Sequence, residues 1–168
     1  MGPDLINGIP AHILLVHAVV VLVPLTALAL IASAAFPPVM RRFGLALPVL
    51  ALVSLISVPL TTHAGEWLER HVDSDPLVRK HAELGDQLLP WVLGLFLLAT
   101  GVWWVYRRAT RTGTARPAPV SVPVRVAAAV LALAVGAGAV VQVYRIGDSG
   151  AKAAWHDGYS ATAHSDRH

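Results

Sequence analysis

Residues 9–36 read IPAHILLVHAVVVLVPLTALALIASAAF, and from Ile13 to Phe36 this stretch contains no Asp, Glu, Lys or Arg. A helix that spans a membrane needs about 20 predominantly apolar residues. The two histidines of the stretch, His12 and His17, stand at its start, where an imidazole in hydrocarbon costs free energy unless its ring nitrogens are satisfied. The stretch therefore predicts a membrane-spanning helix with a polar site at one end.

Three more apolar segments follow, so that the predicted spans are about 13–36, 45–62, 87–106 and 126–144. A secretory signal competes for the first segment, but no Lys or Arg precedes it, and the apolar core of such signals has about 7–15 residues. Only 14% of the residues are charged, against about 25% in soluble domains. We predict an all-α polytopic membrane protein, a four-transmembrane-helix bundle formed by residues 1–146, followed by a flexible tail at 147–168.

The charged residues predict an orientation. The loops at 37–44 and 107–125 carry arginines and no acids, whereas the connection at 63–86 carries six acids against three bases. Short loops rich in Lys and Arg stay cytoplasmic. Loops 37–44 and 107–125 are therefore expected inside, and loop 63–86 and both termini outside (N-out/C-out). The basic loops contain no stripe of interleaved aromatics, so we expect lipid contact and no nucleic acid.

The second and third helices are expected to extend outside the membrane. The segment TTHAGEWLERH can prolong the second helix outward, and SDPLVRKHAELGDQLLPW begins with a capping Ser74 or Asp75 followed by Pro76. The third helix would then run from the outer loop through the membrane in one piece. In the fourth helix, Ala132 and Gly136, like Ala134 and Gly138, have the four-residue spacing that lets membrane helices approach closely.

All eight histidines fall on the predicted outer side. His17, His63 and His81 come from three different helices at similar depth, and imidazoles from facing helices can ligate a b-type haem. The chain has no cysteine, which excludes covalent haem attachment through Cys-x-x-Cys-His and thiolate metal sites. The candidate cofactor residues are therefore His17, His63 and His81, and those of a surrounding shell or an alternative site are His12, Glu66, Asp86, Tyr144 and Arg145.

Other interpretations remain open. Zinc or copper could be held by His63, Glu66 and His81. Alternatively no cofactor is bound, and the polar residues form an internal hydrogen-bond network in a structural or assembly subunit of a larger membrane complex. In that case His12 is an interfacial polar residue, and His17 bonds a buried partner such as Glu66, Asp86 or Gln142. Ser54 and Ser57 lie in the middle of the second helix, far from His17, and the closer Thr61 and Thr62 are expected to bond the backbone near Pro59. We therefore expect no independent catalytic activity.

Four segments together carry a family resemblance: IPAHILLVHAVVVLVP (9–24), TTHAGEWLE (61–69), HAELGDQLLPW (81–91) and VYRIGDSGAKAAW (143–155). They resemble the bacterial membrane family called domain of unknown function 2231. The resemblance implies four spans in the bacterial plasma membrane and no established chemistry. The motif positions that it carries over are His12, His17, Gly65, Glu66, His81, Tyr144, Arg145 and Gly147. Many members have a histidine where this chain has Ile146. Related domains occur beside respiratory-type redox proteins, which implies redox membrane subunits as partners.

Overall fold

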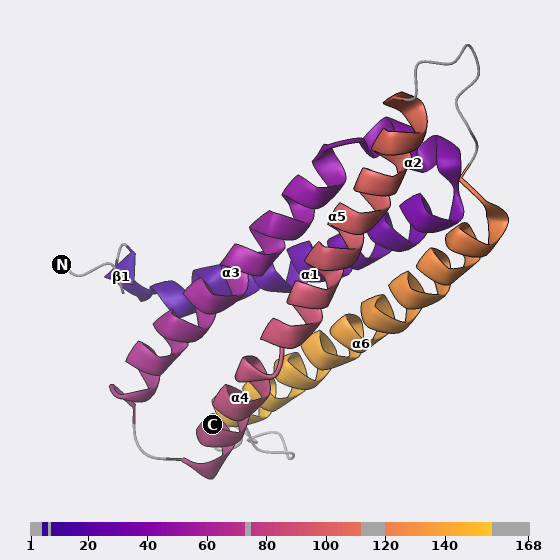
Figure 1. The fold of residues 1–168 in the computed structure, drawn as a ribbon. Helices are drawn as coiled ribbons and strands as arrows, with labels where there is room; N and C mark the ends of the chain where they lie inside the picture. The colour runs from indigo at the N-terminus through magenta and orange to yellow at the C-terminus, as the bar shows by residue number, and fades with distance from the viewer. Residues whose placement is uncertain (1–4, 7, 73–74, 112–119, 156–168) are drawn as a thin grey trace, which may run out of the picture.

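The computed structural model describes residues 5–6, 8–72, 75–111 and 120–155. Its helices form an elongated bundle (Figure 1), which confirms the predicted all-α class. The elements are β1 (Leu5–Ile6), β2 (Ile9–Pro10), α1 (Ala11–Ala35), α2 (Pro37–Phe43), α3 (Ala46–Glu69), α4 (Pro76–Asp86), α5 (Leu89–Arg111) and α6 (Val122–Trp155). Within the described residues, four helical segments are long and apolar enough to cross a membrane: α1, α3, α4 together with α5, and α6.

The four long helices are arranged in a ring. Helix α1 packs against α3 and α6, and α5 packs against the same two helices from the opposite side. The beginning of α1, the end of α3, all of α4 and the end of α6 lie at one end of the bundle, which we call the histidine end. Helix α2, the end of α5 and the start of α6 lie at the other, the arginine end.

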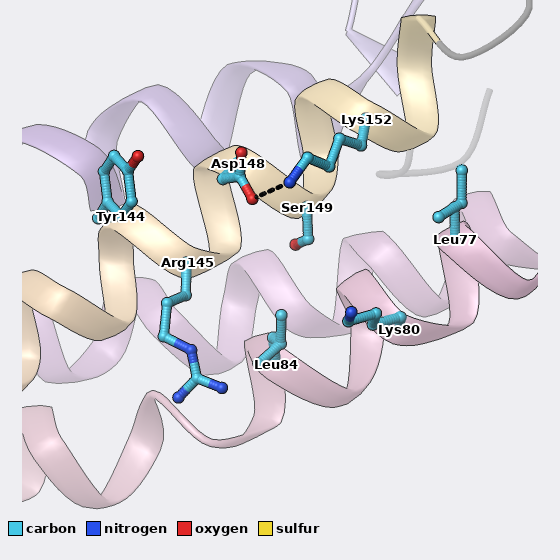
Figure 2. Close-up of a pocket in the computed structure, with 8 residues that line it drawn as sticks. All are labelled: Leu77, Lys80, Leu84, Tyr144, Arg145, Asp148, Ser149 and Lys152. Carbon is cyan, nitrogen blue, oxygen red and sulfur yellow. Dashed lines mark hydrogen bonds and ion pairs between the residues drawn. The ribbon is translucent and has the colours of Figure 1, made fainter.

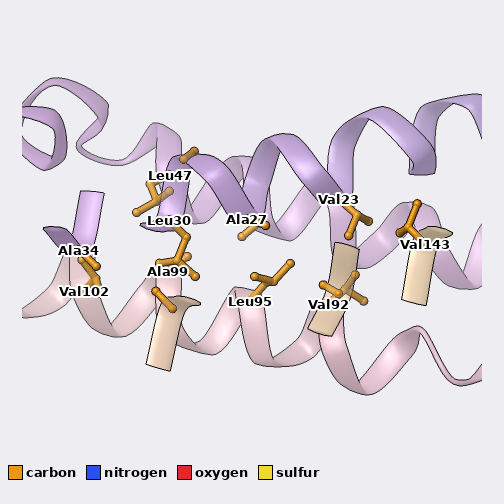
Figure 3. Close-up of a cluster of buried hydrophobic side chains, with 14 of the residues drawn as sticks. Val23, Ala27, Leu30, Ala34, Leu47, Val92, Leu95, Ala99, Val102 and Val143 are labelled. Atoms are coloured by element: carbon orange, nitrogen blue, oxygen red, sulfur yellow. The ribbon is translucent and has the colours of Figure 1, made fainter. Parts of the chain in front are cut away.

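The core of the bundle is a column of small and branched side chains (Figure 3). Val23, Leu30, Leu47, Val92 and Leu95 are each completely or almost completely buried. By contrast, many large apolar residues on the outer faces of the helices are exposed, such as Val21, Leu28, Leu97 and Leu133. A soluble protein rarely exposes so much contiguous apolar surface, whereas a bilayer covers it. The fold is therefore that of a multi-pass membrane protein.

Small residues on α6 allow the close packing that their spacing predicts. A Cβ added at Gly136 would lie 3.0 Å from Cδ1 of Ile31 and 3.4 Å from Cβ of Ala27, so this glycine brings α6 against α1. Ala132, one turn earlier, is fully buried. Gly138 faces α5 instead, where the Trp91 ring occupies the space of its missing side chain. Ala134 is exposed, so only some of these small residues lie in a contact between helices.

Buried hydroxyls connect α1 and α3 in the middle of the bundle. The hydroxyls of Thr26 and Ser54 are 2.7 Å apart, and both side chains are buried. The Ser54 hydroxyl also lies within hydrogen-bond distance of the carbonyls of Leu22 and Leu50. Hydrogen bonds between helices add about 0.6–2 kcal/mol each in a membrane protein. This pair fixes how α1 and α3 face each other.

Helix α2 and the third span differ in detail from the sequence prediction. Pro37 and Pro38 end α1, as expected, but they also occupy the first turn of the short helix α2, where a proline loses no hydrogen bond. The third span, Pro76–Ala109, runs from the outer loop as expected, but a short turn interrupts it, since α4 ends at Asp86 and α5 begins at Leu89. Pro90 has no N–H to donate to the carbonyl four residues earlier, and its ring crowds that carbonyl. The N-cap of α4 is confirmed, since the Asp75 carboxylate accepts from the Leu77 N–H at 2.7 Å.

Helix α6 is longer than the predicted fourth span. It begins at Val122 and continues to Trp155, so the expected start of a tail at residue 147 lies inside a helix. Residues 156–168, the rest of that expected tail, lie outside the described residues. Near the start of α6, a guanidinium nitrogen of Arg125 donates to the carbonyl of Ala35, the last residue of α1, at 3.1 Å. This arginine therefore satisfies a C-terminal carbonyl of α1 and complements the helix dipole there.

Candidate functional site at the histidine end

His12 stands in the first turn of α1, directly after Pro10 and the small β1–β2 hairpin. Its Nδ1 lies 3.0 Å from the carbonyl oxygen of Thr61 in α3. A Cβ added at Gly65, one turn further along α3, would meet Nδ1 of the same ring at 3.0 Å. The ring of His12 therefore packs closely against α3 at Gly65, and a side chain at position 65 would require the ring to shift.

His81 has the same arrangement on the other side. It lies on α4, on the same face as Leu84. Its Nδ1 is 3.1 Å from both the carbonyl of Ile146 and the hydroxyl of Ser149 in α6. A Cβ added at Gly150 would lie 2.9 Å from Cε1 of His81. Each of these two histidines is thus bonded through Nδ1 to a neighbouring helix and packed against a glycine of that helix.

The rings of His12 and His81 form a pair. Their centroids are 6.1 Å apart, and their planes stand nearly perpendicular, at 86°. Because a carbonyl oxygen only accepts hydrogen bonds, Nδ1 carries a proton in both rings. In the neutral form of such a ring, Nε2 presents a lone pair. Neutral histidines that bind metals commonly have this arrangement.

The surroundings of His81 favour the uncharged form of its ring. Helix α4 carries Arg79, Lys80, Glu83 and Asp86 within eleven residues, so it lies outside the apolar part of the third span, which α5 provides. Burial lowers the pKa of His81, and the neighbouring His12 lowers this pKa further, while the hydrogen bond to the Ile146 carbonyl opposes both effects. The ring is therefore uncharged at neutral pH and available as a base or ligand.

The structure does not bring together the histidines that the sequence grouped. His17 is exposed, and its Nδ1 lies 2.6 Å from the carbonyl of Ile13 in its own helix. His63 is also exposed, with 79% of its side chain accessible, and its Nδ1 is 4.0 Å from a carboxylate oxygen of Glu66. Of the expected set His17, His63 and His81, only His81 lies in the histidine pair, and its partner is His12.

The other expected residues surround the pair at a distance. Glu66 and Asp86 are exposed, as are Tyr144 and Arg145 on α6. Gln142, considered as a partner for His17, is buried and instead donates to the carbonyl of Leu84 at 2.8 Å. Within residues 5–6, 8–72, 75–111 and 120–155, no group of three or more His, Asp and Glu side chains could hold a metal ion.

Sequence reasoning missed the groups that hold the pair: the Thr61 and Ile146 carbonyls, Ser149, and the contacts of Gly65 and Gly150. Backbone carbonyls carry no sequence signal. The glycines do carry one, since a glycine inside a helix costs about 0.5–1 kcal/mol relative to alanine and usually marks a close packing contact. Gly65 and Gly150 are both of this kind.

Comparison with known proteins gives one match. The family described as "Predicted membrane protein (DUF2231)" matches residues 8–163, which include all the helices above. No curated protein and no solved structure matches the chain. The family match covers most of the sequence and confirms the resemblance drawn from its four motifs. The chain therefore belongs to the DUF2231 family of predicted membrane proteins.

Proposed function

We propose that this protein is a b-type haem-binding electron-transfer subunit in which His12 and His81 are the axial ligands. The proposal rests on the pair itself, in which two imidazoles from different helices have their ring centroids 6.1 Å apart, each with Nδ1 bonded to a neighbouring helix. A bound haem b would supply one-electron transfer near one face of the membrane. His17 and His63 are no longer among the proposed ligands.

The separation of the rings fits two ligands on one metal. A metal–nitrogen bond of about 2.0–2.1 Å puts the metal about 3.2 Å from the ring centroid, so two such rings are at most about 6.4 Å apart. The observed 6.1 Å is just below that limit. The spacing of the two rings would therefore allow both imidazoles to reach a single metal.

The number of ligands favours haem over a bare ion. Structural zinc sites use four protein ligands, and catalytic ones use three. Only two histidines meet here, and no group of three or more His, Asp and Glu gathers anywhere in the described part of the chain. A porphyrin brings its own equatorial nitrogens and needs only axial ligands from the protein. The zinc or copper alternative with His63, Glu66 and His81 has less support.

The second candidate is a structural or assembly subunit without a cofactor. It is favoured by the fact that the Nδ1 contacts of both histidines also join helices: His12 links α1 to α3, and His81 links α4 to α6. A buried polar network of this kind can serve packing alone. In either case we place the protein in the bacterial plasma membrane with the histidine end outside, next to other redox subunits.

The test is a visible spectrum of the protein purified in detergent from a haem-competent bacterium. We expect a Soret band and a reduced-minus-oxidised difference in the wild type, both lost in His12→Ala and in His81→Ala. The matched controls are His17→Ala in α1 and His63→Ala in α3. Both substitutions remove an exposed histidine, and both variants should keep the spectrum of the wild type. Colourless protein with stoichiometric zinc or copper would support the bare-ion alternative. Colourless and metal-free protein that co-purifies with membrane subunits would support the structural one, and both results overturn the haem proposal.

A further inference from the structure

A shallow cleft of about 180 Å³ lies between α4 and α6 at the histidine end (Figure 2). Helix α4 contributes one wall and α6 the other. Ser149 reaches both the cleft and Nδ1 of His81, so the cleft adjoins the histidine pair without containing it. The lining residues are Leu77, Lys80, Leu84, Tyr144, Arg145, Asp148, Ser149 and Lys152.

The charges of the cleft are unbalanced. Three cations, Lys80, Arg145 and Lys152, face a single carboxylate, that of Asp148. This carboxylate is already bonded to Lys152 Nζ at 2.7 Å in the next turn of the same helix. Neither Lys80 nor Arg145 forms an ion pair with any residue that the structure describes. Figure 2 shows Arg145 extending from α6 toward α4. Two cations from different helices are thus available to one anion.

The position of the cleft corresponds to the level of lipid headgroups. Val140 and Val141 of α6 are exposed apolar residues, and the polar segment that begins with Tyr144 and Arg145 follows directly. Tyr144 is 73% exposed, as expected for an aromatic side chain at a membrane interface. Leu77 and the buried Leu84 give the cleft an apolar floor beside its cations. A ligand with an anionic head and apolar chains would satisfy both parts.

We propose that this cleft binds the phosphate group of an anionic phospholipid. Arg145 would contact the phosphate through its planar guanidinium, which matches phosphate oxygens bidentately, and Lys80 would contact it as a point charge from the facing helix. The acyl chains would lie along the apolar face of α6.

The test measures lipid retained by the delipidated full-length protein in detergent, using native mass spectrometry with added phosphatidylglycerol or phosphatidylcholine. The wild type should bind phosphatidylglycerol preferentially. The double variant Lys80→Gln/Arg145→Gln should bind it about thirtyfold more weakly, because each cation near a membrane surface contributes roughly 1 kcal/mol. The matched control is Arg70→Gln/Arg79→Gln, which removes the same charge from exposed positions at the same end but outside the cleft.

Each outcome decides the proposal. Loss of binding in the cleft variant alone supports it. An equal loss in both double variants shows a general charge effect, and no loss in either shows that the cations bind nothing; both results overturn it. If inorganic phosphate at equal concentration displaces the lipid, the cleft recognises a free phosphate anion. That result overturns the lipid assignment. The readout does not involve haem, so it is independent of the proposed function.

Discussion

His12 and His17 are five residues apart on α1 and have opposite environments. At about 100° per residue, five residues turn about 140° from one face of a helix to the other. His12 therefore faces α3 and bonds to Thr61, whereas His17 is exposed and bonds to a carbonyl of its own helix. At this scale, what distinguishes a candidate ligand from a surface histidine is a contact with another helix.

The glycines beside the histidine pair make a residue-scale prediction. Gly150→Ala places a Cβ 2.9 Å from Cε1 of His81 and should lower the free energy of unfolding by about 1–3 kcal/mol, because the half-buried ring must move. Gly147→Ala, one turn earlier in α6, meets no atom within 4 Å and should be neutral or stabilise by about 0.5–1 kcal/mol. Tryptophan fluorescence during titration with denaturing detergent measures both.

A double variant tests whether this cost comes from the contact between the new Cβ and the His81 ring. Adding His81→Ala to Gly150→Ala removes the group with which the new Cβ collides, so the cost of the glycine substitution should largely vanish in that background. If Gly150→Ala costs the same with and without His81, the ring does not occupy this space, and the close packing described here is incorrect.

The break between α4 and α5 shows how one element depends on another. At the break, the Leu88 N–H donates to the Gly85 carbonyl at 3.0 Å instead of continuing the helical pattern to Leu84. The freed Leu84 carbonyl accepts from Nε2 of Gln142 in α6 at 2.8 Å, in a buried position. The turn between α4 and α5 thus leaves the Leu84 carbonyl as an acceptor, and α6 supplies the donor.

Gln142→Met therefore makes an element-scale prediction. Methionine has a similar length and no donor, so the buried Leu84 carbonyl loses its partner and the bundle should be destabilised by about 1–3 kcal/mol. Ser57→Ala is the control, since the Ser57 hydroxyl bonds only within α3, to the Ser54 carbonyl, and its loss should cost under about 0.5 kcal/mol. Equal effects of the two substitutions in the same denaturing titration would contradict this role of Gln142.

At the scale of the whole molecule, the two ends of the bundle differ in charge and chemistry. The arginine end carries Arg107 over the Trp103 ring at 4.9 Å and Arg108 over the Trp104 ring at 4.8 Å, as expected for side chains at a membrane interface. The acids of the segment between α3 and α5 belong to the histidine end. This asymmetry is the basis of the predicted orientation.

Because the chain has no cysteine, orientation can be tested with single introduced thiols. Val72→Cys, at an exposed position after α3, should react with a membrane-impermeant maleimide in intact spheroplasts. Thr114→Cys, in the basic segment between α5 and α6, should react only after the membrane is permeabilised. Fully permeabilised cells control for the reactivity of each thiol. The reverse pattern would place the histidine end in the cytoplasm.

The sequence by itself determined the number of spans, the ends of α1 at Pro10 and Pro37, a helix cap at Ser74 or Asp75, and the family. These features depend on local properties: hydropathy over about 20 residues, proline geometry and side-chain capping. The pairing of His12 with His81 was decided only by the tertiary structure. It depends on the rotation of each helix about its axis, which the packing of Gly65 and Gly150 sets, and on bonds to carbonyls that no side chain reveals.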